Sequence, residues 1–355
     1  MRRTTFAQAL TILLGTPAAF WPSIAGADSA SPPTLSQLDL LGLLDVVFLQ
    51  KLANSVRPAP SGAVGENQAS FDQVGVQNQS SFVVPDALVE RNREELDNAL
   101  KVLEFGYAHM RPDGSFEYAD TGRSGAPPTA LTQDSSAAFL MYDTGHSLCL
   151  LRESSWFQSD PDVADERQRV AVLETKARTA ITRLVSEADV LRTDRLAVNR
   201  TINYAMAYYL NGKALNHADA LAAGRNFIDN ALGRQTAAGV FTENSGFDSS
   251  YQGVSLFHAQ VLLLEMLPED EALRKRLWSG VVRGMQREME TVQADGTVGT
   301  VGNTRVSAQG ERVFGVTKSI DTRSVSLALM YYAYATGDQN LQRTARAVAA
   351  RYALL

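Results

Sequence analysis

The residues best suited to chemistry lie in one polar stretch, from Gly239 to Leu256. It reads Gly-Val-Phe-Thr-Glu-Asn-Ser-Gly-Phe-Asp-Ser-Ser-Tyr-Gln-Gly-Val-Ser-Leu. A serine before the final apolar run can cap a helix, which places Tyr251 and Gln252 in the first turn. A tyrosine hydroxyl there can face a cleft and act as a general acid or base if a nearby cation or amide favours the phenolate. Tyr251 is therefore the leading catalytic candidate, and Gln252 a candidate for substrate binding; simple packing at the helix start is the alternative.

The same stretch resembles the toroidal polysaccharide lyases, especially the helical domain of the heparinase and alginate-lyase type. In that family an Asp-Gly-x-x-x-Glu turn is followed by a few residues, a Tyr and then a helix. Gly239, Glu243, Asp248 and Tyr251 carry the resemblance. An earlier turn that ends at Glu117 echoes only the beginning of the pattern.

The resemblance covers the helical region, about residues 87–355, and implies an (α/α) toroid. It implies cleavage of a uronate-containing polysaccharide by β-elimination. A base removes the C5 proton, an acid protonates the leaving glycosidic oxygen, and no water is consumed. Tyr251 would be the acid and could also be the base, while Glu243, Asp248 and Glu117 would lie at the substrate. The polysaccharide is the expected partner, and no cofactor is implied.

Those lyases also use an Asn near a helix start, often with a His. The nearest counterparts are Asn199 and Asn203, which are four residues apart and share a helix face. An Asn amide can donate to a uronate carboxylate and stabilise the charge that builds as the C5 proton leaves, and Arg200 could bind that carboxylate bidentately. Tyr204 could stack on a sugar or belong to the core. The plainer alternative is that Asn199 caps the helix and Asn203 is solvated.

Among the four histidines, His258 and His146 are the candidates for a role in the site. His258 lies seven residues after Tyr251, on the same helix face, where it could support Tyr251 or act as a base. His146 is the second choice, as a substrate contact, and a structural role is the alternative for both. No pair of histidines has a metal-ligand spacing, so we expect no metal site.

Arginines are frequent in a loop near the end of the chain. Arg305, Arg312 and Arg323 could line a subsite for an anionic sugar. Scattered arginines usually belong to a solvated surface, and only Arg323, at a predicted helix start, stands out as a substrate-binding candidate.

Apolar residues recur at helical spacing through most of the chain. The first predicted helix covers 38–52, and a polar, irregular segment covers 56–84. Further helices are predicted at 87–109, 135–152, 164–187, 199–212, 216–232, 252–267, 270–290, 321–336 and 338–354. The β-prone pieces at 298–301 and 313–316 are assigned to loops, so the predicted fold is all-α.

A weak internal repeat organises these helices. Gly114, Gly239 and Gly296 each sit in a turn that follows one helix and leads, through a polar loop, to the next. Such repeated hairpins stack with their loops at one end. The closed form is an (α/α) toroid whose long loops wall a cleft, and an open solenoid is the alternative. The polar segment 53–84 could close over the cleft as a lid.

The composition is that of a globular protein. The 355 residues are 45% hydrophobic and 20% charged, with a net charge of −6, which disfavours nucleic-acid binding. Arg2 and Arg3, an apolar stretch and Ala25-Gly26-Ala27 predict a signal peptide over 1–27. Residues 28–86 would form a leader helix and polar loop, and 87–355 the catalytic domain.

The predicted signal peptide indicates a periplasmic or secreted bacterial protein. The single cysteine, Cys149, cannot form an internal disulfide and is expected in the core. No later segment is apolar enough to span a membrane, and we expect a monomer.

Two other classes of function stay open. An α/α-toroid glycoside hydrolase would use two carboxyl groups with separated pKa values, and Glu243 with Asp143 or Asp134 is the most plausible pair. A non-catalytic glycan-binding protein of the cell envelope would hold the polymer without turnover. The glycoside hydrolase would lose activity when either acid of the pair is changed to its amide, and would keep activity in the Tyr251→Phe variant.

Overall fold

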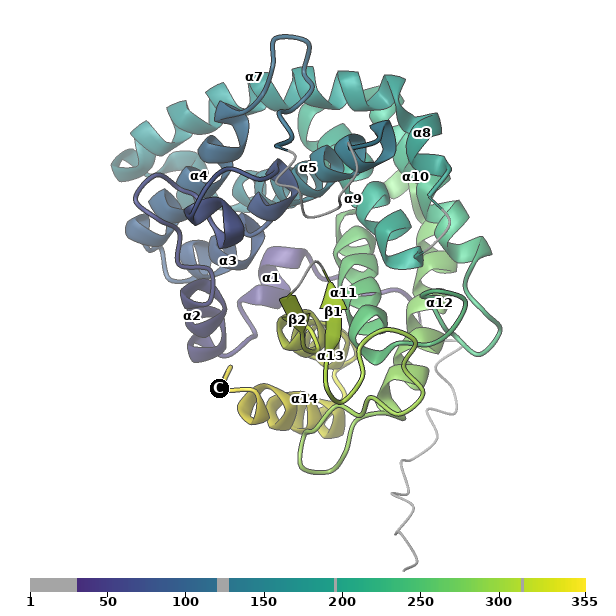
Figure 1. Ribbon diagram of the computed structural model, residues 1–355. Coiled ribbons are helices and arrows are strands. Elements are labelled where there is room, and N and C mark those ends of the chain that lie inside the picture. Colours follow the sequence, from purple (N-terminus) through teal and green to yellow (C-terminus); the bar gives the residue numbers. More distant parts are fainter. Residues whose placement is uncertain (1–30, 120–127, 195–196, 314–315) are drawn as a thin grey trace, which may run out of the picture.

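The computed structural model describes residues 31–119, 128–194, 197–313 and 316–355 (Figure 1). The signal peptide predicted for residues 1–27 lies outside these ranges. Within them the chain is almost entirely α-helical, which confirms the all-α class. In the described part of the chain, no helix has the length and apolar content of a membrane-spanning segment.

The longer helices are α2 (Val46–Asn54), α3 (Ser80–Val89), α4 (Arg93–Ala108), α5 (Ala130–Glu153), α7 (Ala164–Ser186), α9 (Val198–Leu215), α10 (Ala218–Gly233), α11 (Ser249–Glu265), α12 (Glu271–Met289), α13 (Thr322–Thr336) and α14 (Gln339–Arg351). Three shorter helices are α1 (Gln37–Leu41), α6 (Ser155–Ser159) and α8 (Ala188–Arg192). From α7 onward, the long helices match the predicted ranges within a few residues.

Two kinds of helix alternate along the chain. Helices α3, α5, α9, α11 and α13 are buried over most of their length, because small and apolar residues cover nearly all their faces. Helices α4, α7, α10, α12 and α14 bury one apolar face and expose charged residues, as amphipathic helices do. Each buried helix contacts the next buried helix in chain order. In Figure 1, α7, α10, α12 and α14 lie at the periphery, and α1 lies near the middle, where it contacts α3, α5, α11 and α13.

A glycine turn recurs after four helices, α2, α4, α10 and α12. Gly114, Gly239 and Gly296 occupy the turns predicted from the sequence, and Gly62 occupies a fourth. Their φ angles lie between 80° and 91°, a region that favours glycine. A Cβ atom on each would come within 2.0–2.7 Å of a carbonyl oxygen of the next outer helix that receives the turn, α4, α7, α12 or α14. Each turn therefore fixes one helical hairpin against its neighbour.

Two glutamines at equivalent positions hold these turns in place. The amide of Gln252 donates to the carbonyl oxygens of Gly239 at 3.0 Å and Gly284 at 3.2 Å, while its oxygen accepts from a backbone amide of the turn. Gln77 makes the same set of contacts with the turn at Gly62 and with α4. Gln252 is fully buried, so its predicted role in substrate binding is wrong: its amide joins a turn to a helix.

The N-terminal region differs from the prediction in two respects. The helix expected at 38–52 is two helices, because Gly42 ends α1 and the Asp45 side chain caps α2. The segment expected to be irregular over 56–84 includes short 3₁₀ turns, and α3 begins within it at Ser80. The expected domain boundary between residues 86 and 87 thus falls inside a buried helix that packs on α2, α4 and α5.

A small hairpin replaces part of the loop expected before α13. Strand β1 (Glu311–Val313) pairs with β2 (Val316–Lys318) in antiparallel register, with Glu311 opposite Lys318. The β-prone residues near 313–316 therefore mark a real, if short, hairpin, which lies near the middle of the view in Figure 1.

Candidate functional site

The loops that precede the buried helices α9, α11 and α13 are joined to one another by hydrogen bonds. The hydroxyl of Thr304, before α13, donates to the backbone carbonyl of Glu243, before α11, at 2.7 Å. The backbone amide of Asp321 donates to the Ser250 hydroxyl at 2.8 Å. Because the buried helices carry equivalent loops at equivalent ends, polar side chains from distant parts of the sequence gather there.

Tyr251 lies in the first turn of α11, as predicted, and is half-buried. Its hydroxyl donates to Oε2 of Glu311 at 2.9 Å, and the guanidinium carbon of Arg305 lies 4.0 Å from its ring centroid. Arg305 donates from Nε to Oε1 of Glu311 at 2.8 Å and from Nη1 to Oε2 of Glu243 at 3.1 Å. We call these four side chains, Tyr251, Arg305, Glu311 and Glu243, the Tyr251 cluster.

Burial sets the protonation states within the Tyr251 cluster. Glu243 is fully buried, and burial raises its pKa to about 7 even though the bond from Arg305 lowers it. Burial also raises the pKa of Tyr251 above its usual range, against the opposing effect of the Arg305 charge. At neutral pH the tyrosine therefore carries its proton, which points at the carboxyl group of Glu311.

Asp248 positions both Tyr251 and Arg305. Its Oδ1 accepts from the backbone amides of Ser250 at 3.1 Å and Tyr251 at 3.2 Å, which caps α11. Its Oδ2 accepts from the backbone amides of Arg305 at 2.9 Å and Val306 at 2.7 Å. Asp248 is completely buried, so the prediction that it contacts substrate is wrong. It takes the capping role that was predicted for a serine.

Asn199, Asn203 and His258 lie on the neighbouring helices α9 and α11. The Nδ1 atom of His258 is hydrogen-bonded to Oδ1 of Asn203, so two predicted catalytic residues form a pair. Burial lowers the pKa of His258 to about 3, which keeps its ring neutral. The backbone amide of Asn199 donates to Oε1 of Glu243 at 3.3 Å and links α9 to the Tyr251 cluster.

Arg200 and Tyr204 are engaged with another acid. Nε of Arg200 lies 3.0 Å from Oδ2 of Asp194, and the Tyr204 hydroxyl donates to the same oxygen at 2.8 Å. Nη2 of Arg200 donates to the hydroxyl oxygen of Ser135 at 2.8 Å, and the Ser135 hydroxyl lies 2.9 Å from that of Tyr204. Tyr204 is fully buried and presents no face for a sugar, so its predicted binding role is wrong.

His146 and Glu117 also lie in other surroundings. His146 is buried among the inner helices, is hydrogen-bonded to Gln37 of α1, and has its pKa lowered to about 3 by burial. It therefore belongs to the core rather than to a substrate site. Glu117 is on the exposed turn after α4, where its carboxylate lies 2.8 Å from Nδ1 of His109.

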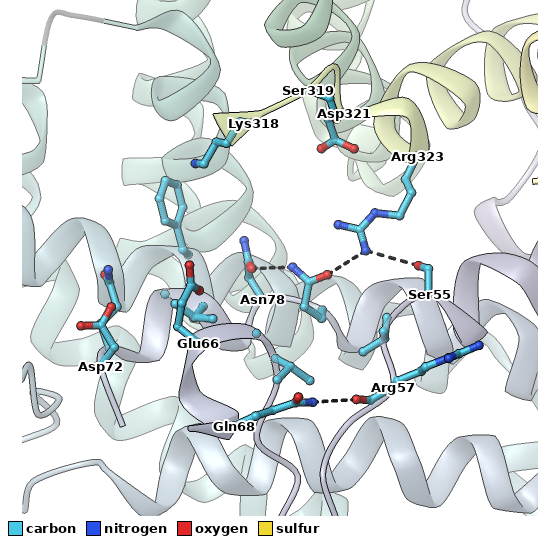
Figure 2. Close-up of a pocket in the computed structure, with 18 of the residues that line it drawn as sticks. Ser55, Arg57, Glu66, Gln68, Asp72, Asn78, Lys318, Ser319, Asp321 and Arg323 are labelled. Carbon is cyan, nitrogen blue, oxygen red and sulfur yellow. Dashed lines mark hydrogen bonds between the residues drawn. The ribbon is translucent and has the colours of Figure 1, made fainter. Parts of the chain in front are cut away.

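Figure 2 shows a second feature of this region, a pocket of about 930 Å³. One wall is formed by residues 55–79, which belong to the segment 53–84 predicted as a lid, and the other by residues 317–323 with Phe139 of α5. The hairpin connects this pocket to the cluster, because Glu311 of β1 contacts Tyr251 and its cross-strand partner Lys318 lines the pocket. Side chains opposite each other on an antiparallel pair project from the same face.

Arg323 reaches across the pocket, as Figure 2 shows. Its Nη1 donates to Oε1 of Gln79 at 3.0 Å and to the hydroxyl of Ser55 at 3.3 Å. Its guanidinium carbon lies 4.5 Å from the ring centroid of Phe82. The sequence-based choice of Arg323 as a substrate-binding residue thus coincides with a residue that lines a pocket.

Sequence reasoning gave no role to Glu311 and placed Arg305 only in a general anionic subsite. Both lie in the long loop between α12 and α13, about 50–60 residues after Tyr251, where no helical period fixes their position. The only sequence signal for Arg305 and Glu311 was that both are charged and lie in a loop before a buried helix, at the position equivalent to the loop that precedes Tyr251.

Comparison with known proteins does not identify a relative: no protein-family model matches the chain, and no curated protein matches it. Among the described residues, no group of three or more His, Cys, Asp or Glu side chains is arranged to hold a metal ion.

Proposed function

We propose that this protein is an exported polysaccharide lyase that cleaves a uronate-containing polysaccharide by β-elimination. The observation that carries the proposal is the Tyr251 hydroxyl, which donates to Glu311 at 2.9 Å while the Arg305 guanidinium covers its ring at 4.0 Å. A phenol between a carboxyl group and a cation is suited to carry a proton in both directions. The predicted signal peptide supports a periplasmic or secreted location, and we propose a monomer.

The proposed architecture is an incomplete (α/α) toroid. The buried helices α3, α5, α9, α11 and α13 contact each other in chain order, and each follows an amphipathic outer helix. The glycine turns repeat with the same contacts to the next hairpin. Such a ring places all loops before the inner helices at one end, which explains why residues from 55 to 323 line one pocket.

In the proposed reaction, Tyr251 acts as both base and acid. Its proton passes to Glu311, and the resulting phenolate, stabilised by Arg305, removes the C5 proton of the uronate. The C4–O bond then breaks as Tyr251 protonates the leaving oxygen, and Glu311 returns the first proton to Tyr251. The proton taken from C5 ends on the leaving sugar, a C4=C5 double bond forms, and no water enters.

Neutralisation of the substrate carboxylate is the second requirement, because it lowers the cost of removing the C5 proton. Asn203 of α9 and its neutral partner His258 supply polar groups on the inner helices, and His258 lies two turns after Tyr251 on α11. We propose that they and Asn199 orient the uronate. Arg200 is paired with Asp194 and has a supporting role.

The glycoside hydrolase alternative is less well supported. Asp143 is fully buried, and its two oxygens accept from the backbone amides of Ser80 at 3.0 Å and Ser81 at 2.9 Å. It therefore caps α3, while Glu243 is bonded to Arg305 and to the amide of Asn199. Asp134 is half-buried, and burial raises its pKa. Of these three acids, only Glu243 belongs to the Tyr251 cluster.

The test is incubation of the purified chain with alginate, polygalacturonate, hyaluronan and a neutral glucan. Ultraviolet absorbance and reducing ends are followed together. A lyase raises both signals on an acidic polymer, because only elimination creates the C4=C5 double bond. Reducing ends without absorbance would indicate a hydrolase and contradict the proposal. Binding without either signal would favour the non-catalytic glycan-binding protein.

A further inference from the structure

Arg323 lacks an acidic partner in the described structure, unlike several other arginines of this protein. Arg169, Arg200, Arg225 and Arg305 each contact a carboxylate at 2.7–3.1 Å. Arg323 instead rests on the Phe82 ring and donates to two neutral acceptors. No carboxylate lies within 4.0 Å of its guanidinium among the described residues.

The surroundings keep this charge in place without neutralising it. Cation–π contact and two neutral hydrogen bonds fix the orientation of a guanidinium. They use only Nη1, so Nε and Nη2 of Arg323 remain available to a ligand. Asp321 is the nearest acid on the same wall, and its two oxygens accept from the amide and hydroxyl of Ser324.

Lys318 adds a second positive charge to the pocket. It is exposed at the end of β2 and has no ion pair in the described structure. Its cross-strand neighbour Glu311 is already bonded to Tyr251 and Arg305. The opposite wall carries the acids Glu66 and Asp72, which have other contacts, and Arg57, whose Nε donates to the backbone carbonyl of Asn54. Arg323 and Lys318 are the two cations of the wall formed by residues 317–323.

Phe139 offers an apolar surface in the same pocket. It lies in the pocket wall, is only partly buried, and packs edge-on against Tyr142 with ring centroids 6.2 Å apart. The C–H face of a pyranose can stack on such a ring. Small-molecule sites have volumes of about 300–1,000 Å³, so a pocket of about 930 Å³ has room for more than one sugar.

We propose that this pocket is a binding subsite for an acidic oligosaccharide segment, in which Arg323 binds a uronate carboxylate, Lys318 assists and Phe139 supports the sugar ring. The inference rests on the proposed function for its substrate class. It places recognition of the negative charge outside the Tyr251 cluster, because no residue of that cluster lines the pocket. The hairpin and the contact between Asp321 and Ser250 join the two regions.

The experiment measures binding separately from turnover. The full chain carrying Tyr251→Phe is titrated calorimetrically with trigalacturonate, triglucuronate and trimannuronate, and with maltotriose as the neutral trisaccharide. Arg323→Gln and Arg323→Lys are then added to that background. We expect one acidic trisaccharide to bind, with affinity reduced about 10- to 100-fold by Arg323→Gln and largely retained by Arg323→Lys. Maltotriose binding should be weaker and insensitive to the change.

Lys318→Gln provides a second variant that cannot fail through folding, because this side chain is exposed and has no contact that holds the structure. It should weaken acidic trisaccharide binding about two- to five-fold. Arg343→Gln, on the exposed face of α14, is the matched control and should have no effect. If Arg323→Gln does not fold, the effect of Lys318→Gln on acidic trisaccharide binding tests the subsite proposal in its place.

The subsite proposal is overturned if Tyr251→Phe and Tyr251→Phe with Arg323→Gln bind the acidic trisaccharide with equal affinity. It is also overturned if acidic and neutral trisaccharides bind equally well, or if no acidic trisaccharide binds. A failure of the proposed function looks different. In that case Tyr251→Phe would leave turnover of the polymer unchanged, while the charge-dependent binding at Arg323 would persist.

Discussion

Replacing Arg305 with methionine removes the cation that faces the fully buried carboxyl of Glu243. Breaking one side of a buried ion pair costs about 3–5 kcal/mol. Because the Arg305 side chain is 21% exposed, we expect the lower end of that range, about 3 kcal/mol at pH 8. Most of this cost comes from the charge left on Glu243.

The cost should depend on pH in a defined direction. Burial raises the pKa of Glu243 to about 7, and Arg305 opposes that rise; without the arginine the pKa rises further. The folded chain then holds this proton more tightly than the unfolded chain, so the free energy of unfolding falls as pH rises from about 4.5 through 7. At pH 5.5 the Glu243 carboxyl group in Arg305→Met is buried in its neutral form. The loss of stability caused by Arg305→Met should then shrink to about 1 kcal/mol, the value of a lost hydrogen bond.

Urea unfolding of four chains at pH 5.5 and pH 8.0 tests this reasoning. The chains are wild type, Arg305→Met, Glu243→Gln and the double variant. We expect the double variant to recover most of the stability lost by Arg305→Met at pH 8.0, because no charge remains buried. The reasoning is refuted if Arg305→Met costs the same at both pH values, or if Glu243→Gln does not rescue it. Activity should stay low in the double variant, since Arg305 is still absent from the Tyr251 ring.

Two further predictions concern the turns and the buried histidines. Gly239→Ala should destabilise the protein by about 2 kcal/mol or more in thermal unfolding. The reason is that φ is +80° and the new Cβ would lie 2.3 Å from the Arg283 carbonyl oxygen. The control is Gly233→Ala in α10, where nothing lies within 4 Å of the new Cβ, and this change should be neutral or stabilising. Burial lowers the pKa of His258 to about 3, so the unfolded chain binds its proton below pH 6.5, and stability is lost as pH falls from 6.5 toward 3. This amounts to about 2 kcal/mol at pH 5. His258→Gln should reduce the pH dependence of urea midpoints between pH 6.5 and 4.5, and His146, whose pKa burial also lowers to about 3, should account for a similar remaining part. An unchanged slope would show that His258 does not contribute to this dependence.

The helical fold could be predicted because it depends on local signals. Apolar spacing located the helices from α7 onward, and the turns at Gly114, Gly239 and Gly296 followed from short sequence patterns. The first hairpin could not be predicted in the same way. α3 has almost no polar face, since it is buried on nearly all sides, and its N-terminus is capped by Asp143 from α5 rather than by a neighbour in sequence.

The candidate site was predictable only in part, for a related reason. Tyr251 follows a turn and begins a helix, and both features are visible in the sequence. Its partners Arg305 and Glu311 come from a loop some 50–60 residues later, and only tertiary packing brings them together. Gln252 and Asp248 were misassigned because polar residues at a helix start have the same sequence pattern whether they bind a ligand or hold a turn.

The proposed reaction depends most on Tyr251. The most direct measurement compares wild type with Tyr251→Phe in the rate at which absorbance of the C4=C5 double bond rises, on the acidic polymer that the wild type cleaves. The matched control is Tyr204→Phe, which removes a hydroxyl that is buried against Asp194 and Ser135. Loss of a general acid–base group predicts a fall in kcat of about 10²–10⁴-fold for Tyr251→Phe, with folding unchanged, and a much smaller change for Tyr204→Phe. Elimination at the wild-type rate in Tyr251→Phe would contradict the central claim.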